Sequence, residues 1–175
     1  MTAPPPCPQP QDFSVLSGFI TPGSDTTPHA LDASIAVSVL DPTENNEPVR
    51  IVEEEDRWDL EVDWCICGRF ADVICGCWNV EVFIDDIDGV GPTHGPLGST
   101  KVDVSTGKPT PGDDTSQKCF EYTFHFPAGR VEPGVYDLVV VITLINTPSC
   151  DTPGRWVQDM LGYAQIPVLL FARNA

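Results

Sequence analysis

Four cysteines lie close together in the stretch CICGRFADVICGC, as Cys65, Cys67, Cys75 and Cys77. The flanking residues alternate between apolar and polar, which predicts two β-strands joined by a turn. In a hairpin whose register brings the flanking tryptophans together, Cys65 faces Cys77 and Cys67 faces Cys75. Facing residues of a non-hydrogen-bonded pair lie about 4.5 Å apart at Cα, within reach of a disulfide. The spacing therefore predicts two cross-strand disulfides on the outer face of one hairpin.

Two other arrangements of these sulfurs stay open. In the first, the thiols are reduced or form disulfides elsewhere, for example with Cys119 or Cys150. In the second, the same four hairpin cysteines bind one zinc ion. Zinc prefers a tetrahedron of sulfurs, usually supplied by C-x₂₋₄-C turns, whereas C-x-C pairs on flat strands form a rectangle. The pattern therefore favours disulfides over a metal.

Residues 1–29 form a proline-rich arm, with 7 of the 18 prolines and only two charges. The prolines around Cys7 favour an extended polyproline conformation, and the alternation that follows places Phe13, Val15 and Phe19 on one side of a strand. We expect this arm to dock on its own domain or to add a strand to a neighbouring subunit. Because seven cysteines is an odd number, one thiol is free or links two chains, and Cys7 is the candidate for that intermolecular or arm-anchoring thiol.

A group of acids follows one predicted strand, as Asp85, Asp86 and Asp88 before a glycine. Carboxylates at this spacing suggest a calcium loop, to which Asp113 and Asp114 would add ligands. The EF-hand pattern needs further acids that this loop lacks, and an Asp-Gly pair is also a common turn. The turn is the preferred interpretation, and we predict no bound metal.

The chain has three histidines, His29, His94 and His125. None lies in a nucleophile motif, and the sequence contains no G-x-S-x-G, no H-E-x-x-H and no phosphate-binding glycine loop. We therefore expect a protein that is not an enzyme and that carries no cofactor.

Composition narrows the class of partner. The 175 residues include 26 acids and 9 bases, a net charge of −17, which would repel both nucleic acid and anionic membranes. Hydrophobic residues make up 41% of the chain, enough for a core, but no apolar run is long enough to cross a membrane. The first residues lack the basic and apolar regions of a signal peptide, while the cysteine content favours an extracellular assembly or a virion over the cytosol.

The elements that position these residues are nearly all strands. Short alternating segments separated by proline and glycine predict a sandwich or barrel. The arm (1–29) would precede a single domain of seven to nine antiparallel strands (30–175). The predicted strands of that domain cover residues 31–40, 49–53, 58–67, 75–84, 99–104, 119–126, 135–145 and 162–172.

One corner favours the sandwich. The segment that ends in Gly-Val-Tyr136-Asp-Leu138 resembles the E–F corner of immunoglobulin-like and fibronectin-type domains, where a tyrosine hydroxyl ties the corner to nearby backbone. Trp64 resembles the tryptophan at the centre of such sandwiches. Leu138 stands where an antibody-type domain has its second inter-sheet cysteine. The resemblance implies an immunoglobulin-like β-sandwich and no particular activity.

These features together favour a non-catalytic structural or assembly protein that associates with itself through its arm and cysteines, as a subunit of a filament, capsid or surface assembly. The alternative is a binding module that holds a protein, a carbohydrate or a metal through the loops at residues 85–98 and 147–155.

Overall fold

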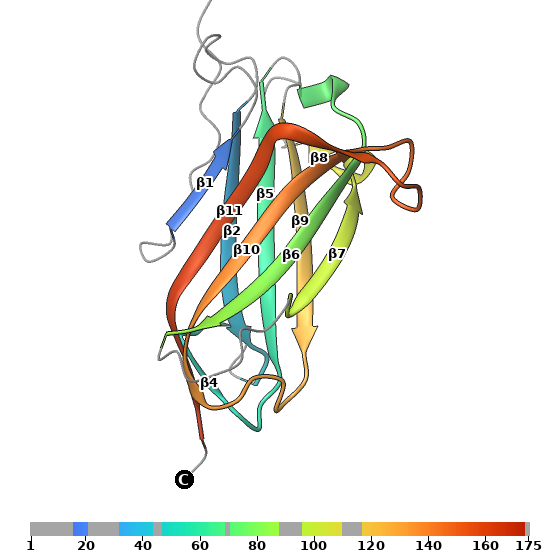
Figure 1. Cartoon of the computed structure of the whole chain (residues 1–175). Helices are drawn as coiled ribbons and strands as arrows, with labels where there is room; N and C mark the ends of the chain where they lie inside the picture. The colour runs from blue at the N-terminus through green and yellow to red at the C-terminus, as the bar shows by residue number, and fades with distance from the viewer. Residues whose placement is uncertain are drawn as a thin grey trace, which may run out of the picture.

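The computed structural model describes residues 16–20, 32–43, 47–68, 71–87, 96–109 and 117–173. They form two β-sheets packed face to face (Figure 1). Sheet A has the strand order β1 (Leu16–Ile20), β11 (Arg155–Ala172), β10 (Gly134–Asn146), β6 (Cys77–Asp86) and β7 (Gly98–Asp103), and β4 (Ile51–Glu53) pairs in parallel with β11. Sheet B has the order β3 (Glu47–Pro48), β2 (Asp32–Asp41), β5 (Trp58–Cys67), β9 (Gln117–Phe126) and β8 (Lys108–Pro109). Two single-turn 3₁₀ helices, η1 (Ala71–Val73) and η2 (Val104–Thr106), lie in the connections.

The strand order is that of an immunoglobulin-like domain. In such domains one sheet runs A-B-E-D and the other C-F-G, to which variable-type domains add C′. Lettered along the chain, β2, β5, β9 and β8 take the order A-B-E-D, and β7, β6, β10 and β11 take the order C′-C-F-G. The predicted immunoglobulin-like sandwich is therefore confirmed.

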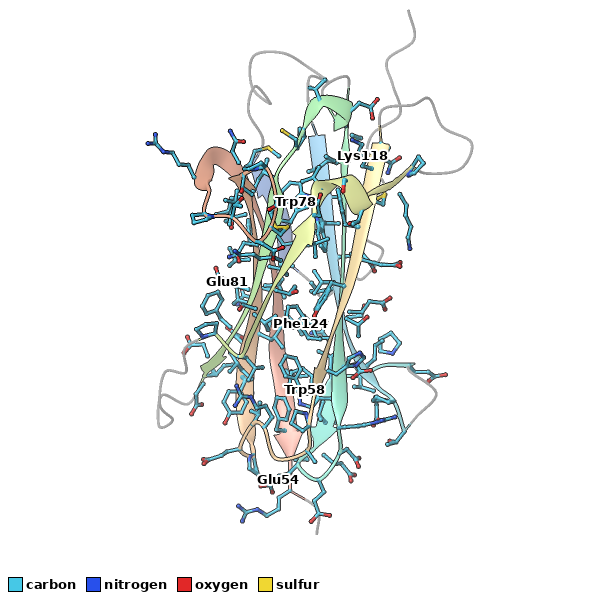
Figure 2. All side chains as sticks on the ribbon, turned by 90° about the vertical axis from the view of Figure 1, so that its right-hand side faces the viewer. Glu54, Trp58, Trp78, Glu81, Lys118 and Phe124 are labelled. Atoms are coloured by element: carbon cyan, nitrogen blue, oxygen red, sulfur yellow. A yellow bond between two sulfur atoms is a disulfide. The ribbon has the colours of Figure 1, made fainter. Side chains whose placement is uncertain are left out.

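Alternation along the strands builds the core. On β5, Trp58, Leu60, Val62, Trp64 and Ile66 are buried, while the residues between them are half-buried or exposed. Aromatic rings fill the middle of the sandwich, among them Trp58, Trp78 and Phe124 in Figure 2. Trp64 stacks on Phe120 with ring centroids 5.3 Å apart. Offset and edge contacts of this kind stabilise a core beyond the area that the rings bury.

The predicted tyrosine corner is present. The Tyr136 hydroxyl donates a hydrogen bond to the backbone carbonyl of Glu132 at 3.0 Å. Gly134 leaves room for the ring, because a Cβ at that position would lie 2.9 Å from the ring of Tyr136. Leu138 is fully buried on β10, in the place of the antibody cysteine. The tryptophan assignment needs a correction: the residue on the C strand of the sandwich is Trp78, on β6, whereas Trp64 lies on β5.

The arm contributes a strand to its own domain. Residues Leu16–Ile20 form β1, which pairs antiparallel with β11 of the same chain, so that Phe19 faces Gly162. Phe13 and Val15 lie outside the described residues. Of the two predicted fates of the arm, docking on its own domain is the one seen for this strand. Pro167 coincides with a shift in the β10–β11 register, which is the bulge that a proline inside a strand predicts.

Candidate functional site

The predicted cysteine hairpin is wrong, because its two strands belong to different sheets. β5 lies in sheet B and β6 in sheet A, joined by a crossover that includes η1. The inward residues of both strands meet across the core, so their outward residues point to opposite sides of the sandwich. Packed sheets are about 10 Å apart, so Cys65 on one outer face cannot reach Cys77 on the other.

Two disulfides with other partners take the place of the predicted pairs. Cys65 bonds to Cys119, directly opposite on β9, with the Cα atoms 4.1 Å apart. Cys77 bonds to Cys150, with the Cα atoms 5.3 Å apart, and this bond fastens the β10–β11 loop over the end of β6. Both partners, Cys119 and Cys150, were the alternative that the sequence left open. The loop at 147–155 is thus anchored to β6 through Cys150.

The remaining cysteines, Cys67, Cys75 and Cys7, bear on the second predicted disulfide, the zinc site and the intermolecular thiol. Cys67 is disulfide-bonded, and Cys75 is the free, exposed cysteine among the described residues. The predicted Cys67–Cys75 bond is therefore wrong. Zinc binding by the four hairpin cysteines is also wrong, because three of them are in disulfides and supply no thiolate. Cys7, the predicted intermolecular thiol, lies outside the described residues.

The calcium hypothesis gains no support. Asp85 and Asp86 are the last residues of β6, while Asp88, Asp113 and Asp114 lie outside the described residues. Within the described ranges, no three His, Cys, Asp or Glu side chains are grouped so that they could hold a metal ion.

His125 is the one histidine within the described residues. Its Nδ1 lies 2.8 Å from a carboxylate oxygen of Asp59, across the β5–β9 ladder. The His125 side chain is 75% exposed, so the pair lies on an open surface rather than in a cleft. His29 and His94 lie outside the described residues.

The outer face of sheet B is acidic. Asp59, Glu61 and Asp63 follow one another on β5, and Glu121 on β9 lies opposite Asp63. We call these four residues the acidic face. Like charges on neighbouring strands repel one another, and nearby cations lower that repulsion.

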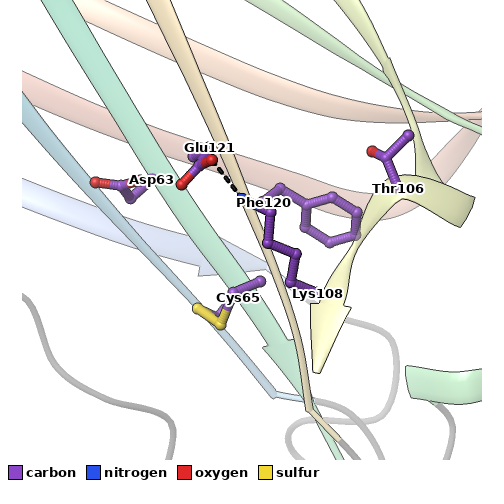
Figure 3. A pocket seen from close by; sticks show the side chains of 7 residues that line it. Asp63, Cys65, Thr106, Lys108, Phe120 and Glu121 are labelled. Atoms are coloured by element: carbon purple, nitrogen blue, oxygen red, sulfur yellow. Dashed lines mark hydrogen bonds and ion pairs between the residues drawn. A yellow bond between two sulfur atoms is a disulfide. The ribbon is translucent and has the colours of Figure 1, made fainter. Parts of the chain in front are cut away.

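A pocket of about 380 Å³ lies at one end of the acidic face (Figure 3). Its lining includes the Cys65–Cys119 disulfide and the side chains of Asp63, Thr106, Lys108, Phe120 and Glu121. Lys108 forms an ion pair with Glu121 in which both side chains are largely exposed. Burial, together with the charges of Glu61 and Glu121, raises the pKa of Asp63 to about 6. The pocket therefore holds more negative charge than its single lysine offsets.

Part of the outer face of sheet A is apolar, beside polar residues such as Glu81, which lies opposite Val141. Phe83 on β6, Val139 and Val141 on β10, and Leu161 and Tyr163 on β11 lie side by side on adjacent strands. We call these five residues the apolar face. Tyr163 is 42% exposed and the other four are half-buried, and no described residue forms a layer over them. An apolar surface that spans three strands is the kind that marks an interaction site.

Sequence reasoning found only part of this surface. Alternation over residues 75–84 predicts that Phe83 points outward, and the structure confirms this orientation. Val139 and Val141 belong to a segment that is apolar on both sides, which predicts a central strand covered on both faces. β10 does lie inside sheet A, between β11 and β6, as its apolar residues on both sides predict. What the sequence did not show is that the outer side of β10 faces away from sheet B.

The strands, corner and disulfides define a fold class, the disulfide-bonded immunoglobulin-like sandwiches. No protein-family model and no curated protein matches the chain. It is similar in structure to the C-terminal domain of wzt, at 10% identity and a TM-score of 0.47, over 94% of this chain and 80% of that one. It is also similar to the CARDB domain of a Pyrococcus furiosus protein in complex with di-metal ions, at 12% identity and a TM-score of 0.38, over 84% of this chain and 100% of that one.

Both TM-scores are below 0.5, so the fold assignment depends on the strand order and the tyrosine corner described above. Among the described residues, no helix is long and apolar enough to cross a membrane.

Proposed function

We propose that this protein is a non-catalytic assembly subunit that associates with a second copy of itself through the apolar face. The observation that carries the proposal is the contrast between the two sides of the sandwich. Sheet B presents carboxylates, whereas sheet A presents Phe83, Val139, Val141, Leu161 and Tyr163. Burying such a surface against another apolar surface is favourable in proportion to its area.

Charge supports a second copy approaching by this face. With a net charge of −17, two copies repel each other in most orientations. The five residues of the apolar face are uncharged, although Glu81 lies opposite Val141 on β6. In a two-fold symmetric dimer, the apolar face of one copy would contact the apolar face of the other.

The size of the face suits a reversible dimer. Three adjacent strands at a spacing of about 4.8 Å, with about five residues each at a rise of about 3.3 Å per residue, give a face on the order of 200 Å². Specific interfaces bury about 800 Å² per partner. We therefore expect association that depends on protein concentration, and that strengthens with salt as like charges are screened.

Because β1 pairs with β11 of its own chain, the proposed assembly does not depend on strand donation by the arm. β1 already occupies the edge of sheet A in its own chain, beside β11. An arm that completes its own sheet extends the face through which copies would meet, rather than donating a strand. Support for a non-catalytic role comes from the His125–Asp59 pair, which lies on an open surface where water competes for its hydrogen bonds.

Sedimentation velocity over a concentration series tests the proposal. Val141→Glu and Tyr163→Glu each place a charge in the centre of the apolar face and should weaken association at least about tenfold. Ala128→Glu adds the same charge in an exposed turn and should leave association unchanged. A wild-type chain that stays monomeric at about 1 mM would show a free energy of association too small for an assembly subunit.

A further inference from the structure

Beyond β8, the long edge of β9 carries backbone groups that no described strand pairs with. Cys65 and Cys119 face each other with Cα atoms 4.1 Å apart, which identifies a non-hydrogen-bonded pair of the antiparallel ladder. The N–H and C=O of Cys119 therefore point away from β5, toward the edge of sheet B. The β5–β9 register continues without a shift, so Glu121, Thr123 and His125 point their backbone groups the same way.

β8 covers only the start of this edge. It pairs with Lys118 and Cys119 and goes no further along β9. In the part of the chain that the structure describes, no strand pairs with residues 121–125 on this side. β7 and β9 lie along the side of the sandwich that faces the viewer in Figure 2, and they belong to different sheets. Over a length of about 17 Å, three donors and three acceptors thus have no partner in any described strand.

The side chains beside this edge select for positive charge. Glu121 points to the acidic face, where Asp63 and Glu61 lie on the neighbouring strand, and Asp59 lies beside His125. The pocket of about 380 Å³ opens next to Glu121. The side chains of Glu121 and Lys108 form an ion pair in which both are largely exposed. Exposed pairs of this kind contribute little stability, so an incoming cation can replace Lys108.

We propose that the β9 edge from Glu121 to His125 binds an extended basic segment of a partner protein, which adds to sheet B as a new strand and directs a lysine or arginine into the Asp63–Glu121 pocket. Strand addition of this kind obtains affinity from main-chain hydrogen bonds and specificity from alternate side chains. The alternation fixes the sequence pattern of the partner. Every second residue lies over the acidic face and should be basic. The residues between them lie toward Tyr122 and Phe124 and should be apolar.

Isothermal titration with synthetic peptides tests this site. The probe is a peptide of alternating lysine and valine, and the expected result is binding that weakens as salt is raised. Methylating the peptide's edge-facing amide nitrogens removes donors but keeps the charge, and should weaken binding about tenfold or more, because the ladder hydrogen bonds are lost. Equal binding by the methylated peptide would overturn the proposal, since simple attraction between charges would then suffice.

Variants of the protein locate the site. Thr123→Pro removes a donor that faces the edge and leaves the β5 ladder intact, so it should abolish peptide binding without unfolding the sheet. Thr123→Ala is the matched control and should bind as the wild type does. The pair Asp63→Asn and Glu121→Gln should weaken binding about tenfold while keeping the backbone edge. If the proline variant is unfolded by circular dichroism, amide shifts in the wild-type protein decide. Shifts confined to Glu121, Thr123 and His125 would support the site, and shifts elsewhere would overturn it.

Discussion

Trp64 and Trp78 meet edge to face across the core, with ring centroids 6.4 Å apart. They come from strands that are consecutive in the chain but belong to opposite sheets, so the contact joins β5 of sheet B to β6 of sheet A. Aromatic pairs in this arrangement contribute about 0.5–1.5 kcal/mol beyond the area that they bury. The same contact explains the cysteine pairing, because it sends the outward residues of the two strands to opposite surfaces.

Removal of the Cys77–Cys150 disulfide should lower stability substantially. The bond closes a loop with a sequence separation of 73, which corresponds to about 4 kcal/mol in the chain-entropy description. We expect the double variant Cys77→Ser, Cys150→Ser to lose a large part of that amount in denaturant unfolding. Cys75→Ser alters the free, exposed thiol and should leave the unfolding curve unchanged. If both variants unfold at the same denaturant concentration, the disulfide contributes nothing.

The tyrosine corner should be worth one hydrogen bond. Tyr136→Phe removes the bond from the hydroxyl to the Glu132 carbonyl and keeps the ring that packs against Phe171. The expected loss is about 1 kcal/mol in the free energy of unfolding. Tyr122→Phe removes the hydroxyl of a half-buried tyrosine and serves as the control. A corner without an energetic role would make the two variants equally stable.

Alternation in the sequence was sufficient to predict the strands but not their partners. The period of two specifies which side of a strand faces the core, and this predicted the bounds of β5 without error. It does not specify which sheet a strand joins, and for that reason Cys65 was assigned to the wrong partner. β3 and β8 have two residues each, too few to show any period. The apolar face was hidden for a related reason, since a strand apolar on both sides is expected to be covered on both.

Gly76 should not tolerate a side chain. Its φ is +127°, and a Cβ there would lie 2.3 Å from the backbone carbonyl oxygen of Ile145. The residue ends the crossover between the sheets, immediately before Cys77. Gly76→Ala should therefore cost about 1–3 kcal/mol in unfolding free energy from backbone strain, with the close contact adding to that loss. Gly129→Ala is the comparison, because its φ is also positive, at +68°, but a Cβ there meets nothing within 4 Å. Equal losses would show that strain alone, rather than the contact with Ile145, decides the effect.

Asp63 should make stability fall as pH rises. Burial first, and then the charges of Glu61 and Glu121, raise its pKa from 3.8 to about 6, so the folded protein holds this proton more tightly than the unfolded chain does. Stability from this group is complete below pH 4 and is lost as pH rises toward 6. Lys108 lines the same pocket and forms an ion pair with Glu121.

The substitution Asp63→Asn isolates this contribution. At pH 7 the variant should be more stable than the wild type, because it lacks a charge that burial and the neighbouring acids disfavour. Partial exposure to solvent limits the gain to about 1 kcal/mol. At pH 4, close to the unfolded pKa of 3.8, most of this difference should be gone. Glu53→Gln removes an equal charge from an exposed position and controls for the change in net charge. A stability difference that is the same at pH 4 and pH 7 would mean that Asp63 does not titrate between those values. Repulsion among the carboxylates of the acidic face would then be too weak to keep Asp63 protonated above its ordinary pKa.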